Sequence, residues 1–405
     1  MKNNNMITVV NKKGKNMKKY FAIILALTLA LALAACGGGA KNADNRKALP
    51  EEAEASVQQT STDGYAEAVP PIYDAALDFS EGLAAVRLDG KWGFIDKTGE
   101  IVIPFQYYMV DSFSEGLAVA TMDPDGLVGY IDKTGTEVIP YIYKGANPFI
   151  EGVAAVQTED DSGPNIFFID QTGAEFTPPY YSAEDFSEGL AVVQHGMMNY
   201  LYIDKTGKEV ISLEGTDRGK PFSEGLALIY HFENKGFIDK SGEMVITLED
   251  YHLPGDVESF SDGLALVKSG IFKNGFIDKS GQLVIEVDGL ASSFSEGRAK
   301  VSFMDGWGYI DKTGAEVIPG KYDWAHDFSE GLAAVQLDGK LGYINAAGEE
   351  VVPFVYDYPD LDEILTFDVD NLDVDQLLLF HDFKVSEGMA MIRLDGKWGF
   401  VEILQ

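Results

Sequence analysis

The sequence predicts an all-β protein assembled from nine repeat units. A phrase whose clearest copy is Phe-Ser-Glu-Gly-Leu-Ala, at 79–84, recurs along most of the chain. Among the first eight copies the step ranges from 34 residues, Phe79 to Phe113, to 38 residues, Phe222 to Phe260. Most copies are followed by Gly, an aromatic residue, Ile-Asp-Lys, Thr or Ser, and Gly. Many of the 43 glycines stand in Asp-Gly and Thr-Gly pairs, which favour turns between short strands. A unit of about 35 residues indicates a repeat architecture, and such proteins generally bind rather than catalyse.

Residues 1–35 have the pattern of a signal peptide that ends in a lipobox. Lys18-Lys19 supplies positive charge, and Tyr20–Leu33 is an apolar run too short to cross a membrane comfortably. The motif Leu33-Ala-Ala-Cys36 resembles the bacterial lipobox. In lipoproteins this motif implies diacylation of the cysteine sulfur and cleavage just before it, so we expect Cys36 to carry a lipid. The protein is then exported and anchored to the bacterial cell membrane, with its folded domain outside the cytoplasm.

Some features of this terminus stay open. An ordinary signal peptide or a membrane span explains the same apolar run, and translation starts at either Met1 or Met17. Gly37 gives no retention signal of the Asp type, so the leaflet that holds the lipid is not defined. Cys36 is the only cysteine, which excludes disulfides and cysteine-based metal sites within the chain.

Residues 36–68 predict a disordered tether that follows the lipidated cysteine. The stretch is rich in Gly, Ala, Glu, Gln and Thr, lacks apolar periodicity and has no aromatic residue before Tyr65. The formal net charge of the whole chain is −34. So acidic a surface repels nucleic acid and anionic lipid headgroups, suits a soluble exported domain, and could attract cations or basic partners.

The first unit illustrates the local structure expected in the repeat domain, 69–405. Leu83–Leu88 reads as a strand, Asp89-Gly90 as a two-residue hairpin turn, and Lys91–Asp96 as the return strand. Lys97-Thr-Gly99 forms a second turn, and Glu100–Phe105 a third strand whose Pro104 marks an exposed or ending side. Each unit is therefore predicted to be a three-stranded meander without helix.

Three slots of the unit have readable roles. The Phe of the phrase is predicted to anchor the core between neighbouring units. In the second strand, pairs such as Phe94-Ile95 alternate faces, which predicts that one side chain of each pair is buried deeper than the other. The Glu of the phrase has two interpretations: a row of carboxylates that binds cations or a basic partner, or acceptors of backbone N–H groups that pair with lysines such as Lys97, Lys133 and Lys205. The carboxylates are Glu81, Glu115, Glu151, Glu188, Glu224, Asp262, Glu296, Glu330 and Glu387.

Lys91-Trp-Gly-Phe94, Lys397-Trp-Gly-Phe400 and Trp307-Gly-Tyr309 resemble the bacterial WG repeat, also called the KWG repeat. The flanking phrases match as well, and the resemblance spans about 69–405. The Trp slot is degenerate, and Lys235 and Asn274 in it predict that the slot is partly solvent-facing in units five and six. The resemblance implies an all-β repeat protein, often exported, of mostly undefined function and with no catalytic set. The slot holds Trp92, Val128, Ile166, Tyr200, Lys235, Asn274, Trp307, Leu341 and Trp398.

The phase of the repeat favours a closed ring. The domain opens with Val69-Pro-Pro-Ile-Tyr, which matches third-strand endings such as Val317-Ile-Pro-Gly-Lys-Tyr322. It closes at Lys397–Glu402, a second strand with no third after it. The N-terminus therefore supplies the strand that the C-terminus lacks, as in closed propellers. A propeller-like toroid is favoured over an open β-solenoid, although nine blades exceed the usual four to eight.

An acidic insertion at about 357–381 is the one large break in the repeat, and function grafted onto the scaffold would fit there. Its dense carboxylates suggest Ca²⁺, but the sequence lacks the glycine of an EF-hand loop, and its apolar residues suggest short packing helices instead. His195 and His231 occupy equivalent positions in adjacent units, where chance placement is favoured over a metal site. We assign no catalytic, cofactor or metal residue.

The function expected from these observations is binding rather than catalysis. The chain is predicted to be a lipid-anchored module for a protein or an envelope polysaccharide, with Trp92, Trp307, Trp324 and Trp398 as candidate ligand-facing aromatics. One alternative is a carbohydrate-active hydrolase that uses acidic residues on the repeat scaffold, which requires units whose acids depart from the repeat. Another is a structural spacer without a ligand. The oligomeric state and the ligand do not follow from the sequence.

Overall fold

The computed structural model describes residues 64–404 apart from 125, 161–162, 197–198, 214–217, 231–234, 249–256, 269–272 and 360–382. All described residues belong to the second of the chain's two units, Ala48–Gln405. The predictions for the signal peptide, for Cys36, for most of the tether and for most of the acidic insertion lie outside the described residues. Within them, no helix is long and apolar enough to cross a membrane.

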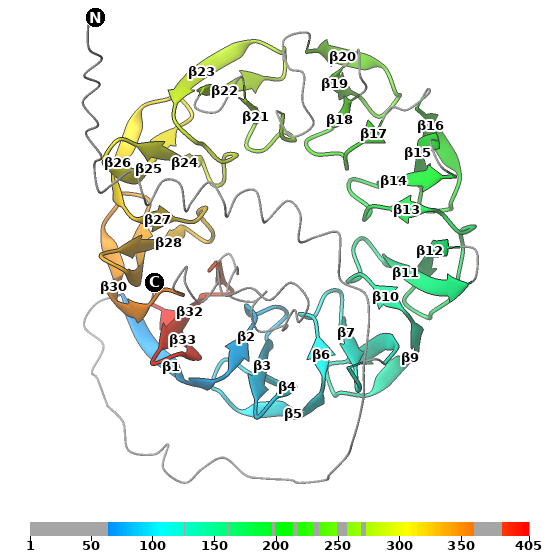
Figure 1. Cartoon of the computed structure of the whole chain (residues 1–405), viewed down its shortest axis with the longest axis horizontal. Coiled ribbons are helices and arrows are strands. Elements are labelled where there is room, and N and C mark those ends of the chain that lie inside the picture. Colours follow the sequence, from blue (N-terminus) through cyan, green and yellow to red (C-terminus); the bar gives the residue numbers. More distant parts are fainter. Residues whose placement is uncertain are drawn as a thin grey trace, which may run out of the picture. The chain divides into compact units, whose positions relative to one another are not determined.

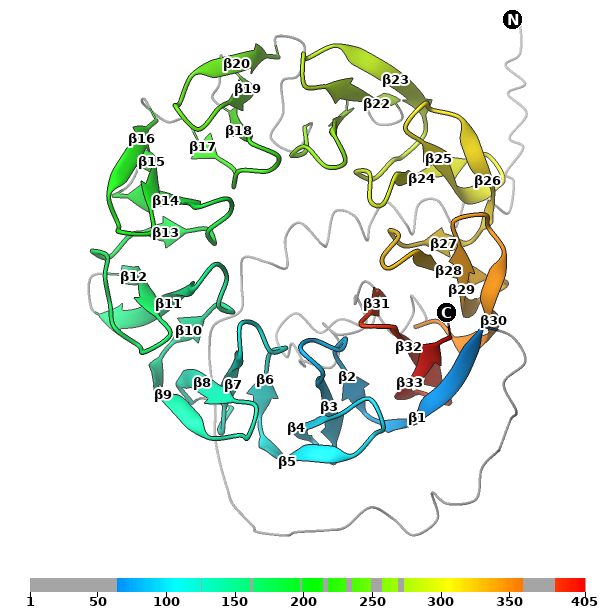
Figure 2. The same ribbon diagram turned by 180° about the vertical axis from the view of Figure 1, so that it is seen from behind.

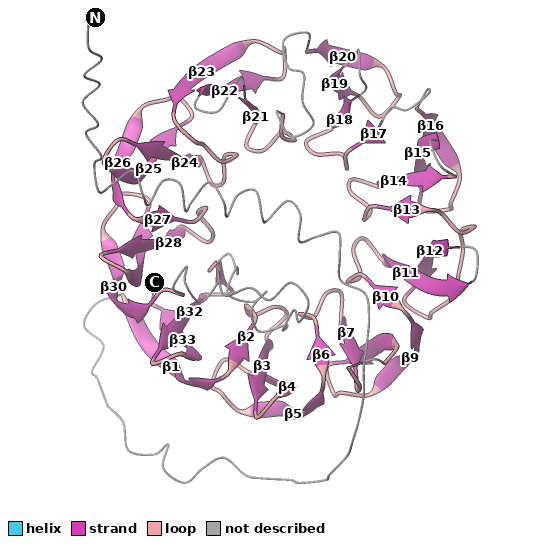
Figure 3. Cartoon of the chain, viewed as in Figure 1, coloured by secondary structure: helices cyan, strands magenta, loops and turns pink. Residues whose placement is uncertain are grey.

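Nine small antiparallel sheets follow one another around a ring and form a nine-bladed β-propeller (Figures 1 and 2). Every regular element of the described chain is a strand (Figure 3). The all-β prediction and the choice of a closed ring over an open solenoid are therefore confirmed.

The blades are numbered here in chain order. Blades 1 to 4 comprise β2–β5 (Ala75–Ala76, Ala84–Leu88, Lys91–Ile95, Ile101–Tyr107), β6–β9 (Met109–Val110, Leu117–Thr121, Val128–Asp132, Glu137–Tyr143), β10–β12 (Gly145–Ala146, Val153–Asp160, Gly163–Asp170) and β13–β16 (Ser182–Ala183, Leu190–His195, Asn199–Asp204, Glu209–Ser212). Blades 5 to 9 comprise β17–β20 (Arg218–Gly219, Ala227–Tyr230, Lys235–Ile238, Met244–Thr247), β21–β23 (Leu264–Lys268, Lys273–Asp278, Leu283–Asp288), β24–β26 (Arg298–Phe303, Gly306–Asp311, Glu316–Tyr322), β27–β30 (Trp324–Ala325, Leu332–Leu337, Lys340–Asn345, Glu350–Asp357) and β31–β33 with β1 (Val385–Ser386, Met389–Leu394, Lys397–Ile403, Tyr65–Tyr73).

A typical blade has four strands rather than the predicted three. In blade 1 the expected meander is present as β3, β4 and β5, and the additional strand is β2, whose two residues pair with Val86 and Arg87 of β3. A strand of two residues has no alternation of its own, so the sequence pattern could not reveal it. Among the described residues, blade 3 has no continuous outer strand, and the inner strand of blades 6 and 7 is represented by a single bridge, Val257 with Val267 and Ala291 with Val301.

The ring closes where the two ends of the repeat domain meet. Strand β1 runs antiparallel to β33, with Tyr65 opposite Ile403 and Tyr73 opposite Trp398, and becomes the outer strand of blade 9. This confirms that the N-terminus supplies the strand missing at the C-terminus. The strand begins at Tyr65, four residues before the predicted boundary at Val69, because its pairing with β33 continues to the end of that strand.

The core lies between neighbouring blades. The Phe of each phrase packs against the aromatic residue in the second long strand of the preceding blade, as Phe113 does on Phe94, with ring centroids 4.8 Å apart. The same contact closes the ring, where Phe79 packs on Phe400 at 4.9 Å. The predicted role of this Phe as an anchor between units is therefore confirmed. The other such pairs are Tyr130–Phe149, Phe168–Phe186, Tyr202–Phe222, Phe237–Phe260, Phe276–Phe294 and Tyr309–Phe328.

Two predictions about burial were wrong for one physical reason. Phe94 and Ile95 are both fully buried, rather than one deeper than the other. Lys235 and Asn274 in the Trp slot are buried as well, and Asn274 donates a hydrogen bond to the carbonyl of Gly289. Each blade is covered by a neighbour on both faces, so the alternation of side chains along a strand separates two buried surfaces instead of a buried and an exposed one.

Candidate binding surface

In each blade the loop before the first long strand, such as β3 or β7, points toward the centre of the ring (Figures 1 and 2). These loops contain the Phe-Ser-Glu-Gly phrase, and we call the nine of them together the inner loop ring. The acidic residue of every copy has a positive φ, between 51° and 57°. This is the left-handed region that residues other than glycine seldom adopt. The free-energy cost of this backbone conformation requires a compensating interaction in each copy, and the acidic side chain provides it.

Serine hydroxyls make the first set of contacts between blades. Ser80 Oγ donates to the carbonyl of Phe113 at 2.6 Å, and Ser386 Oγ donates to the carbonyl of Phe79 at 2.7 Å, which joins blade 9 to blade 1. Eight of the nine copies make this bond, and the exception is the third copy, which has Ile150 in place of Ser. The other six donors are Ser114, Ser187, Ser223, Ser261, Ser295 and Ser329.

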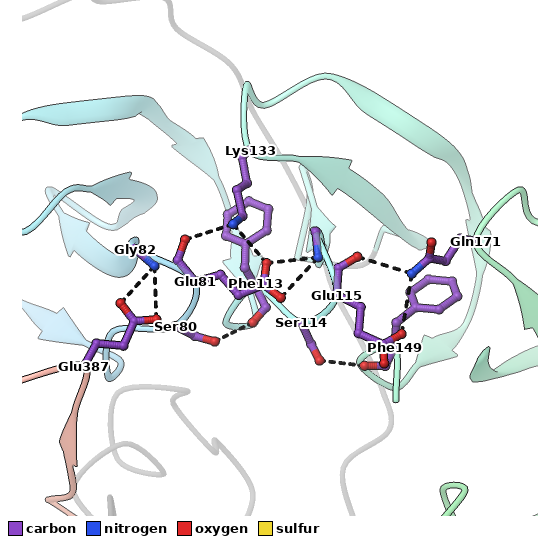
Figure 4. Close-up of polar contacts among 11 residues, drawn as sticks. Ser80, Glu81, Gly82, Phe113, Ser114, Glu115, Lys133, Phe149, Gln171 and Glu387 are labelled. Atoms are coloured by element: carbon purple, nitrogen blue, oxygen red, sulfur yellow. Dashed lines mark hydrogen bonds and ion pairs between the residues drawn. The ribbon is translucent and has the colours of Figure 1, made fainter. Parts of the chain in front are cut away.

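The acidic side chains make the second set. One Glu81 carboxylate oxygen lies 3.0 Å from the backbone nitrogen of Gly116 in the next blade, which donates to it, and 3.0 Å from Lys133 Nζ (Figure 4). Lys133 Nζ also donates to the Glu81 carbonyl, at 2.9 Å. Glu387 accepts a hydrogen bond from the backbone nitrogen of Gly82 in the same way (Figure 4), and its ion pair with Lys97 closes the circle.

Three copies lack the lysine of this arrangement. Gln171 replaces it beside Glu115 and donates to the Glu115 carbonyl at 3.2 Å. Ala346 and Ile403 occupy the corresponding slots opposite Glu296 and Glu330. There each carboxylate instead accepts two backbone N–H bonds, as Glu330 does from Glu387 and Gly388 at 2.8 and 2.7 Å. Every acidic residue of the inner loop ring thus has a backbone donor.

Electrostatics agree with this structural role. Burial raises the pKa of Glu81, but the hydrogen bonds from Lys133 and from Gly116 outweigh it and hold that pKa below the usual value. Burial likewise raises the pKa of Glu151 and Glu188, and hydrogen bonds from a lysine and from backbone N–H groups outweigh it, so both pKa values are lowered. The carboxylates are engaged in joining blades, which supports the interpretation as N–H acceptors and lysine partners rather than as a row of free cation ligands.

The candidate ligand-facing tryptophans separate into two pairs. Trp92 and Trp398 are core residues, 2% and 3% exposed, so burial removes them from any contact with a ligand. Trp307 and Trp324 are only half-buried, on β25 and β27 of adjacent blades. Their rings pack edge to face with centroids 5.2 Å apart.

Met304 belongs to the same hairpin as Trp307 and was not predicted from the sequence. It is fully exposed at the tip of the hairpin that joins β24 to β25, three residues before Trp307. Blades 1, 8 and 9 carry Asp-Gly at this tip, with positive φ at both residues, whereas Met304 and Asp305 have negative φ and the turn ends at Gly306. The signal in the sequence is a methionine where other units have Asp89, Asp338 and Asp395. We call Met304, Trp307 and Trp324 the Met–Trp patch.

The described residues on either side of the insertion meet in an aromatic cluster. Tyr358 before it and Phe383 after it stack with centroids 5.5 Å apart, and Phe383 also packs on Trp398 at 5.6 Å. His326 Nε2 lies 3.0 Å from the Tyr358 hydroxyl. This aromatic cluster explains the burial of Trp398. The acidic insertion, for which short packing helices were favoured over a Ca²⁺ site, falls almost wholly outside the described residues.

The described residues form a cleft between two blades and contain no metal cluster. The cleft has a volume of about 360 Å³ and lies between blades 5 and 6, lined by Lys220, Glu258 and several serines, including Ser223 and Ser261. No group of three or more potential metal ligands occurs in the described part of the chain. His195 is exposed, and His231 falls outside the described residues.

A family model described as "WG containing repeat" matches eight segments of the chain, 67–92, 92–123, 129–160, 166–196, 236–270, 275–306, 307–340 and 342–358. Together they cover more than half of the sequence. The chain belongs to the WG-repeat family. This confirms the resemblance noted for Lys91-Trp-Gly-Phe94, and the ninth unit, with Lys397-Trp-Gly-Phe400, completes the same pattern in the structure.

Solved structures that resemble this WG-repeat protein are distant in sequence. The computationally designed protein Ika8 is 16% identical, with 72% of this chain and 98% of that one covered and a TM-score of 0.43. BamB from Moraxella catarrhalis is 14% identical, with coverage of 83% and 100% and a TM-score of 0.38. The WD40 β-propeller domain of Doa1 is 13% identical, with coverage of 70% and 96% and a TM-score of 0.33. A search among curated proteins found no significant relative.

Proposed function

We propose that this WG-repeat protein is a lipid-anchored, exported binding module whose Met–Trp patch contacts a protein partner. The observation that carries the proposal is the patch itself, a fully exposed methionine three residues before one of two half-buried tryptophans that pack together, at a hairpin tip where blades 1, 8 and 9 carry Asp-Gly. Tryptophan and methionine are enriched in protein interfaces, and tryptophan dominates their binding energy.

The geometry of the patch favours a protein over a polysaccharide. The two indoles are already ordered by their contact, so little side-chain entropy is lost when a partner packs on them. Their planes are inclined by 62°, which makes a wedge rather than a flat platform for stacking a sugar ring. The flexible thioether of Met304 adapts to the shape of an apolar side chain on a partner.

Membrane attachment is supported by the sequence. The Leu33-Ala-Ala-Cys36 motif provides a cysteine for lipid attachment, and about 30 residues of polar chain follow it, with a typical reach of roughly 30 Å. Such a tether lets the propeller contact partners close to the membrane surface. A Cys36→Ser variant should move from the membrane fraction to the soluble fraction, while a protein that stays with the membrane would contradict the lipid anchor.

Enzymatic hydrolysis finds less support in the ring. An acid–base pair requires two carboxyl groups that are free to exchange protons with a substrate. The repeated carboxylates of the inner loop ring accept backbone N–H bonds instead, including Glu296 and Glu330, which have no lysine partner.

The proposal is tested by crosslinking the full chain in its own membranes. A photoreactive amino acid at position 304 should give a specific crosslinked protein, and Trp307→Ala with Trp324→Ala should abolish it. A photoreactive group at Asp338, the equivalent tip of blade 8, is the matched control and should not capture the same protein. Equal crosslinking from both tips, or a crosslink unaffected by the tryptophan changes, would contradict the proposal.

A further inference from the structure

The outer strands of the blades divide into two classes. In blade 1 the buried Ile103 of the outer strand is followed by Pro104, and five other blades carry proline at the equivalent position. The six prolines are Pro70, Pro104, Pro140, Pro178, Pro319 and Pro353. Three consecutive blades, 4, 5 and 6, depart from this rule. They carry Ser212, Thr247 and Glu286 in the same slot, directly after the buried Ile211, Ile246 and Ile285.

Proline at this slot protects an edge. The outermost strand of a blade pairs on one side only and presents its remaining N–H and C=O groups to solvent, where another strand can add. Proline has no N–H, so in an edge strand it removes a donor from the solvent side without weakening the sheet. Blades 4 to 6 retain that donor and therefore keep an edge that can accept a strand.

Blade 6 has the edge best suited to strand addition. Its outer strand β23 is six residues long, Leu283–Asp288, against four each for β16 and β20. It lies at the end of its three-stranded sheet and pairs only with β22. Leu283 and Val284 are 43% and 46% exposed, while Ile285 and Val287 fix the strand to the core.

The charges on this edge indicate which kind of strand can pair with β23. Glu286 and Asp288 are exposed beside Val284, so two of the solvent-facing side chains of this strand are carboxylates. Antiparallel pairing of two copies of β23 would bring like charges together, which destabilises such a pair. A strand that alternates apolar residues with lysine or arginine is complementary in both charge and pattern.

The geometry points to the outer edge of β23 as a docking site for an extended, basic segment of a partner protein, which adds to blade 6 as a further strand. Main-chain hydrogen bonds supply the affinity, and Glu286 and Asp288 select the basic side chains. This surface is separate from the Met–Trp patch, since it uses the outer strand of blade 6 and none of the patch residues. The two inferences can therefore fail independently.

The experiment uses the full chain in detergent and a blocked eight-residue peptide of alternating Val and Lys as the probe, with binding followed by fluorescence anisotropy. Glu286→Pro gives blade 6 the residue that six other blades carry and should weaken binding at least tenfold. Thr247→Pro makes the same change in blade 5 and should alter the affinity less than twofold. Glu286→Gln keeps the backbone donor and should weaken binding two- to fivefold.

A second peptide keeps the test decisive if Glu286→Pro does not fold. An acidic chain attracts any basic peptide, so the critical control is the same Val–Lys peptide with alternate backbone nitrogens methylated, which keeps its charge and loses its donors. It should bind at least tenfold more weakly. Equal binding of the methylated peptide, an unchanged affinity of Glu286→Pro, or an equal loss in Thr247→Pro would overturn the proposal.

Discussion

The inner loop ring and the outer parts of the blades follow opposite rules. On the inside, serine, acidic residue, glycine and lysine recur almost unchanged, and their polar groups join one blade to the next. On the outside, the hairpin tip of blade 7 and the outer edges of blades 4 to 6 depart from the repeat and leave side chains or backbone groups exposed. The contrast teaches that the features repeated nine times maintain the ring, while the departures from the repeat are the sites that we propose for partner binding.

Acidification should cause the largest loss of stability, because it protonates carboxylates in every blade at once. The pKa values of Glu81, Glu151 and Glu188 are held below the usual value, and the Thr98 hydroxyl lowers the pKa of Asp96 in the adjoining turn. A carboxyl whose pKa is lower in the folded state stabilises the protein above its unfolded pKa, and this contribution is lost as the pH falls.

We therefore expect the melting temperature to be constant near neutral pH and to fall steadily below about pH 4.5, the ordinary value for glutamate. Thermal unfolding between pH 3 and pH 7 measures it. A melting temperature that rises on acidification would contradict the role of the inner carboxylates.

Loss of one aromatic anchor should be the next largest effect. Phe113→Ala removes a fully buried ring that packs on Phe94 between blades 1 and 2, and we expect a loss of about 3–5 kcal/mol in the free energy of unfolding. Val102, which is 40% exposed on the outer strand β5, is the matched position, and Val102→Ala should cost less than about 0.5 kcal/mol. Urea denaturation compares the two, and similar losses would erase the distinction between inside and outside.

The same contrast between buried and exposed positions limits what the sequence could predict. The repeat, the turn chemistry, the Phe anchors and the closure by the first strand follow from local patterns such as Asp89-Gly90 and from the phase of the units. The number of strands in a blade and the burial of Lys235 do not, because they depend on neighbours that cover both faces of each sheet.

The residues of the proposed binding surfaces were predicted only in part. All four tryptophans satisfied the same sequence criterion, and only the structure separates Trp92 and Trp398 from Trp307 and Trp324. Met304 and the missing proline at Glu286 are visible in the sequence once the units are aligned, but their meaning depends on knowing that one lies at an exposed tip and the other on an outer edge.

Charge neutralisation at two inner glutamates should distinguish copies with and without lysine. Glu81→Gln loses an ion pair with Lys133, whereas Glu296 has only backbone donors, so Glu81→Gln should cost about 0.2–1 kcal/mol more than Glu296→Gln. Lys133→Met combined with Glu81→Gln completes a double-mutant cycle. A coupling energy of zero would mean that the lysine fills space without stabilising the ring.

Restoring a residue that other blades carry should give the smallest change in stability, and this change should be favourable. Gln171→Lys restores the missing lysine beside Glu115 and should raise the stability by about 0.2–1 kcal/mol. Met304→Asp, which likewise restores a residue used by other blades, should leave the stability unchanged and weaken partner binding. Destabilisation by Gln171→Lys would show that this interface between blades 2 and 3 follows another rule.

Amide hydrogen exchange of the full chain tests the central claim most directly. Loops ordinarily exchange fast, but the account predicts slow exchange at the glycines of the inner loop ring, such as Gly82, Gly116 and Gly388, because each donates to a carboxylate of the preceding blade. It predicts equally slow exchange at the junction of blades 9 and 1, and faster exchange along the outer edge of β23. Rapid exchange of Gly82 and Gly388 with protection elsewhere would show an open chain of blades and contradict the closed ring.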